Sequence, residues 1–243
     1  PMRMIIEDLL DHEAVRRCKD IKLFVTATHV ASGQARVFHV HEIEPSILLA
    51  SACMPFLYQA VEVAGEYYWD GGYMGNPALW PLIYYCEAPD VALVQLNPIH
   101  ENDLPVTAGE IINRLNEINF NSSLIAEMRA IGFVSKLLKE GALDPKRYKD
   151  MHIHVIYSPD QMHKLNASSK LNPDWEFFQF LRDVGRRDAE RWLKEHWDDI
   201  GVKSSINIRE KFLCGPGHPP LGELSEKEAY ENKQQKVKQR KKA

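Results

Sequence analysis

A single carboxylate stands out in the sequence by its immediate neighbours. Asp70 is followed by Gly71 and Gly72 within the stretch YYWDGGYMGNP, residues 67–77. A carboxylate can take a proton from a hydroxyl, and the glycines leave room for a reacting group to approach it. Asp-Gly also favours a hairpin turn, but a loop and a helix start follow here instead of a partner strand. We therefore predict that Asp70 ends a strand, where open α/β sheets commonly build their sites.

The elements before Asp70 follow from short apolar patterns. The stretches IKLFVTATHV (21–30) and ARVFHV (35–40) flank a turn and predict a hairpin. Residues 46–54 predict a buried helix between two prolines. Residues 59–63 and 66–69 predict two strand pieces around an Ala-Gly turn. These elements would place Asp70 at the end of the second strand piece.

The elements after Asp70 alternate between helix and strand. Asn76 and Pro77 suit the start of a helix that runs to about Cys86. The continuous apolar run VALVQL (91–96) is typical of a central strand with both faces covered. Further predicted elements are a helix over 107–140 that breaks or kinks at its asparagines, a strand over 151–157 and a helix over 174–200. The alternation predicts an α/β fold with a mainly parallel central sheet.

Three segments together resemble one known family. They are LFVTATHVASG (23–33), LASACMP (49–55) and the stretch around Asp70-Gly71-Gly72. In this order they resemble the second half of a bacterial patatin-like phospholipase domain, over about residues 20–97. The resemblance implies a three-layer α/β sandwich, incomplete here on its N-terminal side. It also implies a Ser–Asp dyad in which Asp70 is the base and a lipid acyl ester is the substrate.

The chain departs from that family in its nucleophile. The family's serine lies in a Gly-x-Ser-x-Gly elbow, and no serine here has glycines two before and two after it. Ser32 comes nearest. The Gly-rich oxyanion loop is also absent. Because the chain begins Pro-Met-Arg-Met, we expect that it is the C-terminal part of such an enzyme and is inactive alone. An inactive module that binds lipid or a partner is the alternative.

Other reactive residue types carry weaker signals. A Ser-His-Asp triad that uses His29 stays open on paper, whereas Ser51 and Cys53 lie in the small predicted helix and are interpreted as packing. Two His-x-His pairs, at 39 and 41 and at 152 and 154, resemble half of a metal site but lack a third ligand. We expect the second pair to form the polar face of a strand. No metal or cofactor is expected.

The aromatic and apolar residues near Asp70 leave alternatives open. Tyr67, Tyr68 and Trp69 could line an acyl pocket, but core packing is the simpler interpretation. The apolar face of the helix predicted over 107–140 could likewise cover a lipid cleft or pack in the core.

The charge and composition of the chain limit which classes of partner and which cell compartment are expected. The net charge is −4 at pH 7, but residues 224–243 carry a net +4, so the rest carries −8. An acidic body argues against a nucleic-acid partner. We expect residues 1–214 to form the patatin-like part, and 215–243 to form a linker and a disordered basic tail. Scattered cysteines and the absence of a signal sequence favour a cytoplasmic protein, with peripheral membrane contact left open.

Overall fold

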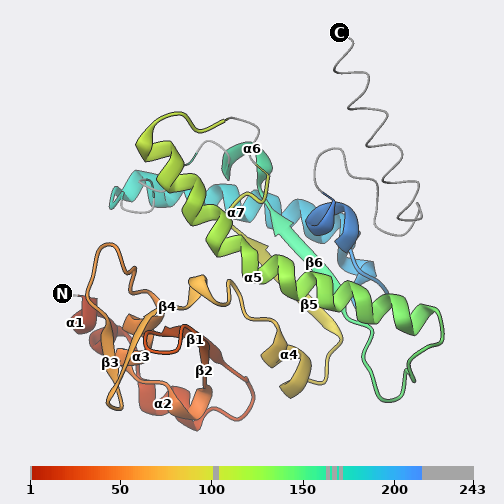
Figure 1. The fold of residues 1–243 in the computed structure, drawn as a ribbon, viewed down its shortest axis with the longest axis horizontal. Helices are drawn as coiled ribbons and strands as arrows, with labels where there is room; N and C mark the ends of the chain where they lie inside the picture. Colours follow the sequence, from red (N-terminus) through yellow and green to blue (C-terminus); the bar gives the residue numbers. More distant parts are fainter. Residues whose placement is uncertain (1, 101–103, 163–164, 166–168, 170–171, 215–243) are drawn as a thin grey trace.

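The computed structural model describes residues 2–100, 104–162, 165, 169 and 172–214, and the predicted linker and basic tail lie outside these residues. The N-terminal part forms a four-stranded sheet in the order β2-β1-β4-β3, and the C-terminal part a two-stranded sheet of β5 and β6. In Figure 1 the long helix α5 crosses in front of β5 and β6, and the N-terminal sheet lies below and to the left of the helix. The predicted α/β class is therefore confirmed.

The N-terminal sheet is antiparallel throughout. It consists of β1 (Phe24–His29), β2 (Ala35–His39), β3 (Val61–Val63) and β4 (Glu66–Asp70). Both predicted turns are present, at 31–34 and at Ala64-Gly65, where Ala64 and Gly65 have positive φ. The predicted buried helix is α3 (Pro45–Ser51), and its Ile47 and Ala50 pack in a core with Phe38 and Tyr68. Helices α1 (Met2–Leu9) and α2 (His12–Arg17) precede the sheet.

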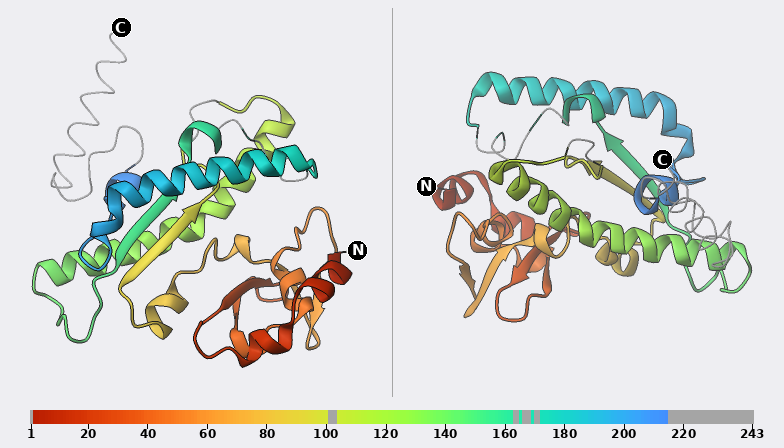
Figure 2. Two further views of the ribbon diagram at one scale, coloured as in Figure 1. Left: turned by 180° about the vertical axis from the view of Figure 1, so that it is seen from behind. Right: turned by 45° about the horizontal axis from the view of Figure 1, so that its top comes forward.

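The C-terminal part is a three-layer arrangement around two parallel strands. Strands β5 (Asp90–Gln95) and β6 (His152–Tyr157) pair in parallel. Helix α5 (Ala108–Lys139) covers one face, and α7 (Trp175–His196) lies on the other (Figure 2). Leu124, Met128 and Ile131 of α5 pack on Val91, Leu93, Ile153 and Val155 of the strands. Parallel pairing is thus confined to this smaller sheet.

Three details of the prediction were wrong. Helix α5 runs without a break through its asparagines. The side-chain N–H of buried Asn121 donates a hydrogen bond to the carbonyl oxygen of Pro98, so this polar side chain has a partner within the core and does not interrupt the helix. Helix α4 (Trp80–Tyr85) begins three residues after Pro77, the predicted first helical residue. Strand β5 is covered on only one face, and Val94 and Leu96 on its other face are 65% and 67% exposed.

The late start of α4 has a cause that is distant in sequence. Glu127 of α5 accepts the backbone N–H groups of Leu79 and Trp80, both at 2.8 Å. A helix leaves its first N–H groups without internal partners, so a carboxylate that binds them fixes where the helix begins. The local signal at Asn76 is overridden by this contact between α4 and α5.

The remaining described elements are short and are distributed over both parts of the chain. They are the 3₁₀ helices at Val40–Glu42, Gly71–Tyr73 and Trp197–Asp199, the short helix α6 (Pro159–Met162) and a π-helical turn at Arg209–Leu213. Phe212 of the last turn packs in the same core as α5. No helix in the described part of the chain is long and apolar enough to cross a membrane.

Candidate functional site

Asp70 is the last residue of β4, as predicted. It pairs with Ala27 of β1, and its carbonyl oxygen accepts the hydroxyl of Thr28 at 2.8 Å. Its carboxylate oxygen Oδ1 accepts the backbone N–H of Gly72 at 2.7 Å, which caps the 3₁₀ turn Gly71–Tyr73. The backbone on both sides of the carboxylate is therefore fixed, so the side chain has a defined direction.

The two positions after Asp70 leave no room for a side chain, so both must be glycine. A Cβ added to Gly71 would lie 2.0 Å from the carbonyl oxygen of Thr26 in β1. A Cβ added to Gly72 would lie 2.1 Å from the ring of Phe120 and 3.0 Å from Oδ1 of Asp70. Backbone thus approaches backbone at Gly71, and an aromatic ring of α5 rests on Gly72. Neither the β4–β1 pairing nor this contact could form with a larger residue in place of either glycine.

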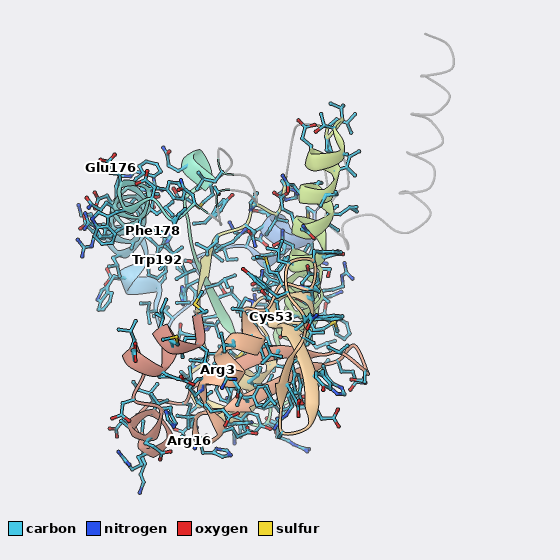
Figure 3. All side chains as sticks on the ribbon, turned by 90° about the vertical axis from the view of Figure 1, so that its left-hand side faces the viewer. Arg3, Arg16, Cys53, Glu176, Phe178 and Trp192 are labelled. Atoms are coloured by element: carbon cyan, nitrogen blue, oxygen red, sulfur yellow. The ribbon has the colours of Figure 1, made fainter. Side chains whose placement is uncertain are left out.

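Two neighbouring groups respond to the charge of Asp70. Burial raises the pKa of the Cys53 thiol, and the carboxylate of Asp70 raises it further. Burial and the same carboxylate also raise the pKa of the Tyr73 hydroxyl. Both groups consequently stay protonated at neutral pH. A neutral thiol is a poor nucleophile, which agrees with the interpretation of Cys53 as packing; its Sγ donates to the carbonyl oxygen of Gln59 at 3.1 Å. Cys53 lies within the N-terminal part in Figure 3.

The predicted aromatic residues divide between core and surface. Tyr68 is buried in the core of the N-terminal sheet, whereas Tyr67 is 52% exposed. Trp69 is intermediate in burial, and none of the three lines the cavity described below. Phe120, which touches the Asp70 loop, was not predicted. It lies fifty positions downstream on a long helix, and no local pattern in the sequence singles it out.

A serine, a histidine and a glutamate meet at the end of the β1–β2 hairpin. His29 Nδ1 lies 2.8 Å from Ser32 Oγ, and His29 Nε2 lies 2.9 Å from Glu66 Oε2. The triad through His29 that the sequence left open is therefore present as a contact, with glutamate as its acid. The Ser32 hydroxyl also accepts the backbone N–H of Gln34 at 3.3 Å, and Glu66 is 62% exposed. These bonds fasten an exposed turn.

The second His-x-His pair is held by a carboxylate. Asp90 Oδ1 lies 2.9 Å from His154 Nε2 and 3.3 Å from His152 Nδ1, and it accepts the N–H of Gly201 at 2.9 Å. The expectation of a polar strand face was wrong for His154, which is 1% exposed and stacks edge-on against Trp192 of α7. Within the described residues no three His, Cys, Asp or Glu side chains are arranged to hold a metal ion.

A large cavity lies at the carboxyl ends of β5 and β6, between α5 and the first half of α7. Its volume is about 490 Å³, in the range of small-molecule sites. Leu96, Ile156, Leu181 and Val184 line it, and Phe120 contributes from α5. Of the two roles that the sequence left open for α5, core packing is confirmed, and the covering of a lipid cleft stays a prediction. Leu124 and Met128 pack in the core, and Phe120 faces this cavity.

Comparison with protein families yields a match over the N-terminal part of the chain. Residues 5–83 match the family model described as patatin-like phospholipase, and this span includes β1 to β4 and the Asp70 loop. A search of curated proteins found no match for the chain. The family points to lipid acyl hydrolysis at a coarse level. Over residues 5–83, which include the motif Asp70-Gly71-Gly72 at the end of β4, the chain is therefore similar to the patatin-like phospholipase family.

Proposed function

We propose that this chain is part of a lipid acyl ester hydrolase that uses a Ser–Asp dyad, with Asp70 as its general base. Asp70 would accept the proton of a serine hydroxyl as that oxygen attacks the ester carbonyl carbon. The alcohol would leave with a proton, and water would then release the fatty acid from the acyl-enzyme. The observation that carries the proposal is the fixed position of Asp70 at the end of β4.

The nucleophile is proposed to come from a Gly-x-Ser-x-Gly elbow outside these 243 residues. No serine of this sequence stands in such an elbow, and Ser32 is bound to His29 on the hairpin turn. Residues 1–243 alone should then show no turnover, because both the covalent step and the oxyanion donors would be missing. The reading frame upstream of Pro1 provides a first test: an encoded elbow supports the proposal.

The decisive experiment uses the protein that carries such an elbow. Asp70→Asn keeps the shape of the side chain but removes its basic oxygen. We expect kcat for a short-chain p-nitrophenyl ester to fall by at least about 10²-fold. Glu66→Gln, which changes an exposed carboxylate at the start of the same strand, is the matched control and should keep normal turnover. Normal turnover by a folded Asp70→Asn variant would contradict the proposal.

The alternative is an inactive module that binds lipid or a partner. The observation that favours it is that no elbow occurs within residues 1–243. A reading frame with a substituted serine, together with no labelling of the whole protein by a fluorophosphonate, would support this alternative. Stoichiometric fluorophosphonate labelling of an elbow serine would exclude it.

A further inference from the structure

We propose that a second cavity, at the amino end of β6, binds a phosphomonoester group. It lies between the last turns of α5, the start of β6 and the segment 202–209, and its volume is about 710 Å³. Its lining begins at Gly132, so the whole cavity lies outside residues 5–83, which match the family. The inference does not depend on the proposed hydrolysis.

The first support is the charge of the lining. Two carboxylates, those of Glu140 and Asp150, face a larger number of cations, which are Lys136, Lys139, Lys203 and Arg209. This excess of positive charge occurs on a chain whose residues 1–223 carry a net −8. A concave surface with cationic walls concentrates anions at one place, even on an acidic protein.

The second support is the way these charges are paired. Lys136 lies 3.6 Å from Glu140, Lys203 lies 3.3 Å from Asp199, and Asp150 accepts the hydroxyl of Ser135 at 2.6 Å. Lys139 forms an ion pair with no carboxylate in the described part of the chain. An anion in the cavity would give its ammonium group a charged partner, and hydrogen bonds between charged groups are the strong ones.

The end of helix α5 explains only part of this arrangement. Lysines in the last turn of a helix are stabilised by its exposed carbonyl groups, which accounts for Lys136 and Lys139. Lys203 and Arg209 come from the segment after α7, to which this reason does not apply. A bound anion that contacts both segments accounts for cations on each of them.

The donors suit a tetrahedral anion better than a flat carboxylate. The Ser204 oxygen accepts the backbone N–H of Ile153 at 2.9 Å, which fixes the hydroxyl at the cavity and leaves its proton to be donated. Lysine binds phosphate as a point charge, and arginine can bind two of its oxygens at once. A phosphomonoester carries a charge of about −1.5 to −2 at pH 7, with oxygens that point toward several walls.

The cavity also has apolar walls between its charges. Met151 is buried, Ile206 and Ile208 are partly buried, and all three belong to the lining. A Cβ on Gly132 would lie 3.7 Å from Ile208, so α5 and the segment 202–209 approach closely there. These walls suit the carbon part of an ester, which favours a phosphomonoester over inorganic phosphate.

The test follows binding residue by residue in the 243-residue chain. The probe is glycerol 3-phosphate, added to nitrogen-15-labelled protein in about 0.1 M NaCl, where scattered surface charges are largely screened. We expect saturable changes in amide chemical shift at 132–140 and 202–209, with half-saturation at or below about 1 mM. Glycerol at the same concentrations should cause no such changes.

The chain offers matched variants. Lys139→Gln and Arg209→Gln should each weaken binding of glycerol 3-phosphate at least about fivefold. Lys139→Arg keeps the charge and should keep most of the affinity. Lys194, like Lys139, is an exposed lysine in the last turn of a long helix, but it is not part of the lining. Lys194→Gln is therefore the control and should bind as the unchanged chain does.

A second arm distinguishes the source of the phosphate group. Vesicles of phosphatidylcholine with phosphatidic acid present the same group as a lipid headgroup. Sedimentation of the chain with these vesicles that Lys139→Gln weakens would identify a lipid. Binding of glycerol 3-phosphate without such sedimentation would identify a soluble ester.

Several outcomes would overturn the inference. One is a set of shifts that does not saturate, or that maps to residues 215–243 or to the surroundings of Lys194. Another is unchanged affinity in either folded variant, Lys139→Gln or Arg209→Gln. Equal binding of acetate would refute the preference for a phosphate group. Since none of these readouts requires hydrolysis, the Asp70→Asn assay decides the proposed function separately.

Discussion

The backbone N–H of Asp70 donates a hydrogen bond to the carbonyl oxygen of Cys53 at 2.8 Å. This bond ties the end of β4 to the residue that follows α3 and its cap. Two of the sequence segments that resemble the family, 49–55 and the stretch around Asp70, are thus joined in space by their main chains. Because the two residues lie close together, the charge of Asp70 changes the pKa of the Cys53 thiol.

Cys53 should react slowly with thiol reagents. Burial and the Asp70 carboxylate both raise its pKa, so little thiolate exists at neutral pH. We expect iodoacetamide to modify Cys18 and Cys86, which are partly exposed, before Cys53. Asp70→Asn removes one of the two causes and should accelerate alkylation of Cys53 in the folded chain, as measured by peptide mass spectrometry. An unchanged rate would mean that the two groups are not coupled.

Alanine in place of each glycine after Asp70 should destabilise the fold to different degrees. At Gly71 the added methyl group meets backbone atoms of β1, which cannot move without breaking the strand pairing. At Gly72 it meets the end of the Phe120 side chain, which can rotate. We expect Gly71→Ala to cost about 3 kcal/mol or more in free energy of unfolding, and Gly72→Ala about 1–3 kcal/mol. Urea denaturation measures both, and Gly109→Ala, which meets no atom, is the control.

The contact of Ser32 with His29 and Glu66 should matter for the turn and not for hydrolysis. In the protein that carries the elbow, Ser32→Ala should keep kcat for the p-nitrophenyl ester within about twofold of the value for the unchanged protein. The reason is that the Ser32 hydroxyl is not expected to act as the nucleophile. The substitution should increase hydrogen exchange at the backbone N–H groups of Gly33 and Gln34. A loss of turnover in a folded Ser32→Ala variant would identify the hairpin triad as the reacting group instead.

Glu127 should make the fold less stable as pH rises above its ordinary pKa. Burial raises the pKa of Glu127, although the N–H groups of Leu79 and Trp80 act against this. The folded chain therefore binds its proton more tightly than the unfolded chain does, so the free energy of unfolding falls as pH increases from 4.5, the ordinary value. Glu127→Gln should remove this fall, as measured by urea denaturation between pH 4 and pH 7.

Glu110 is the control for the sign of that effect. Backbone hydrogen bonds from Thr107 and Val106 lower the pKa of its exposed carboxyl group. Its contribution to stability is present above its ordinary pKa and is lost as pH falls. Glu110→Gln should therefore change the pH dependence in the opposite direction. If both variants changed it in the same direction, the assignment for Glu127 would be wrong.

Asp90 should contribute to stability through its buried partner His154. Although burial raises the pKa of Asp90, hydrogen bonds from His154 and Gly201 and the proximity of His152 bring it below its ordinary value. Asp90→Asn leaves His154 buried with a weaker partner and should cost about 1–3 kcal/mol at pH 7. Asp183→Asn, which removes an exposed carboxylate bound to Arg182, should leave the free energy of unfolding almost unchanged. Equal effects would contradict the role assigned to His154.

Local patterns predicted the elements around Asp70 because their causes are local. The turn at Ala64-Gly65, the prolines around α3 and the glycines after Asp70 all act on their own neighbours. The start of α4 and the contact of Phe120 with Gly72 were missed because they depend on α5, about fifty residues downstream. Burial of His154 was missed for the same reason, since its partners Asp90 and Trp192 come from other elements.

The exposed face of β5 also has a consequence for how the strand behaves. Helix α7 packs on β6 through Trp192 and His154, and Val94 and Leu96 stay open. Among the described strands only β6 pairs with β5. The other edge of β5 therefore offers unpaired backbone donors and acceptors beside an exposed apolar surface. At high concentration this edge is where self-association of the 243-residue chain should begin. Val94→Lys would place a charge on this apolar face, oppose self-association and so raise the solubility of the chain.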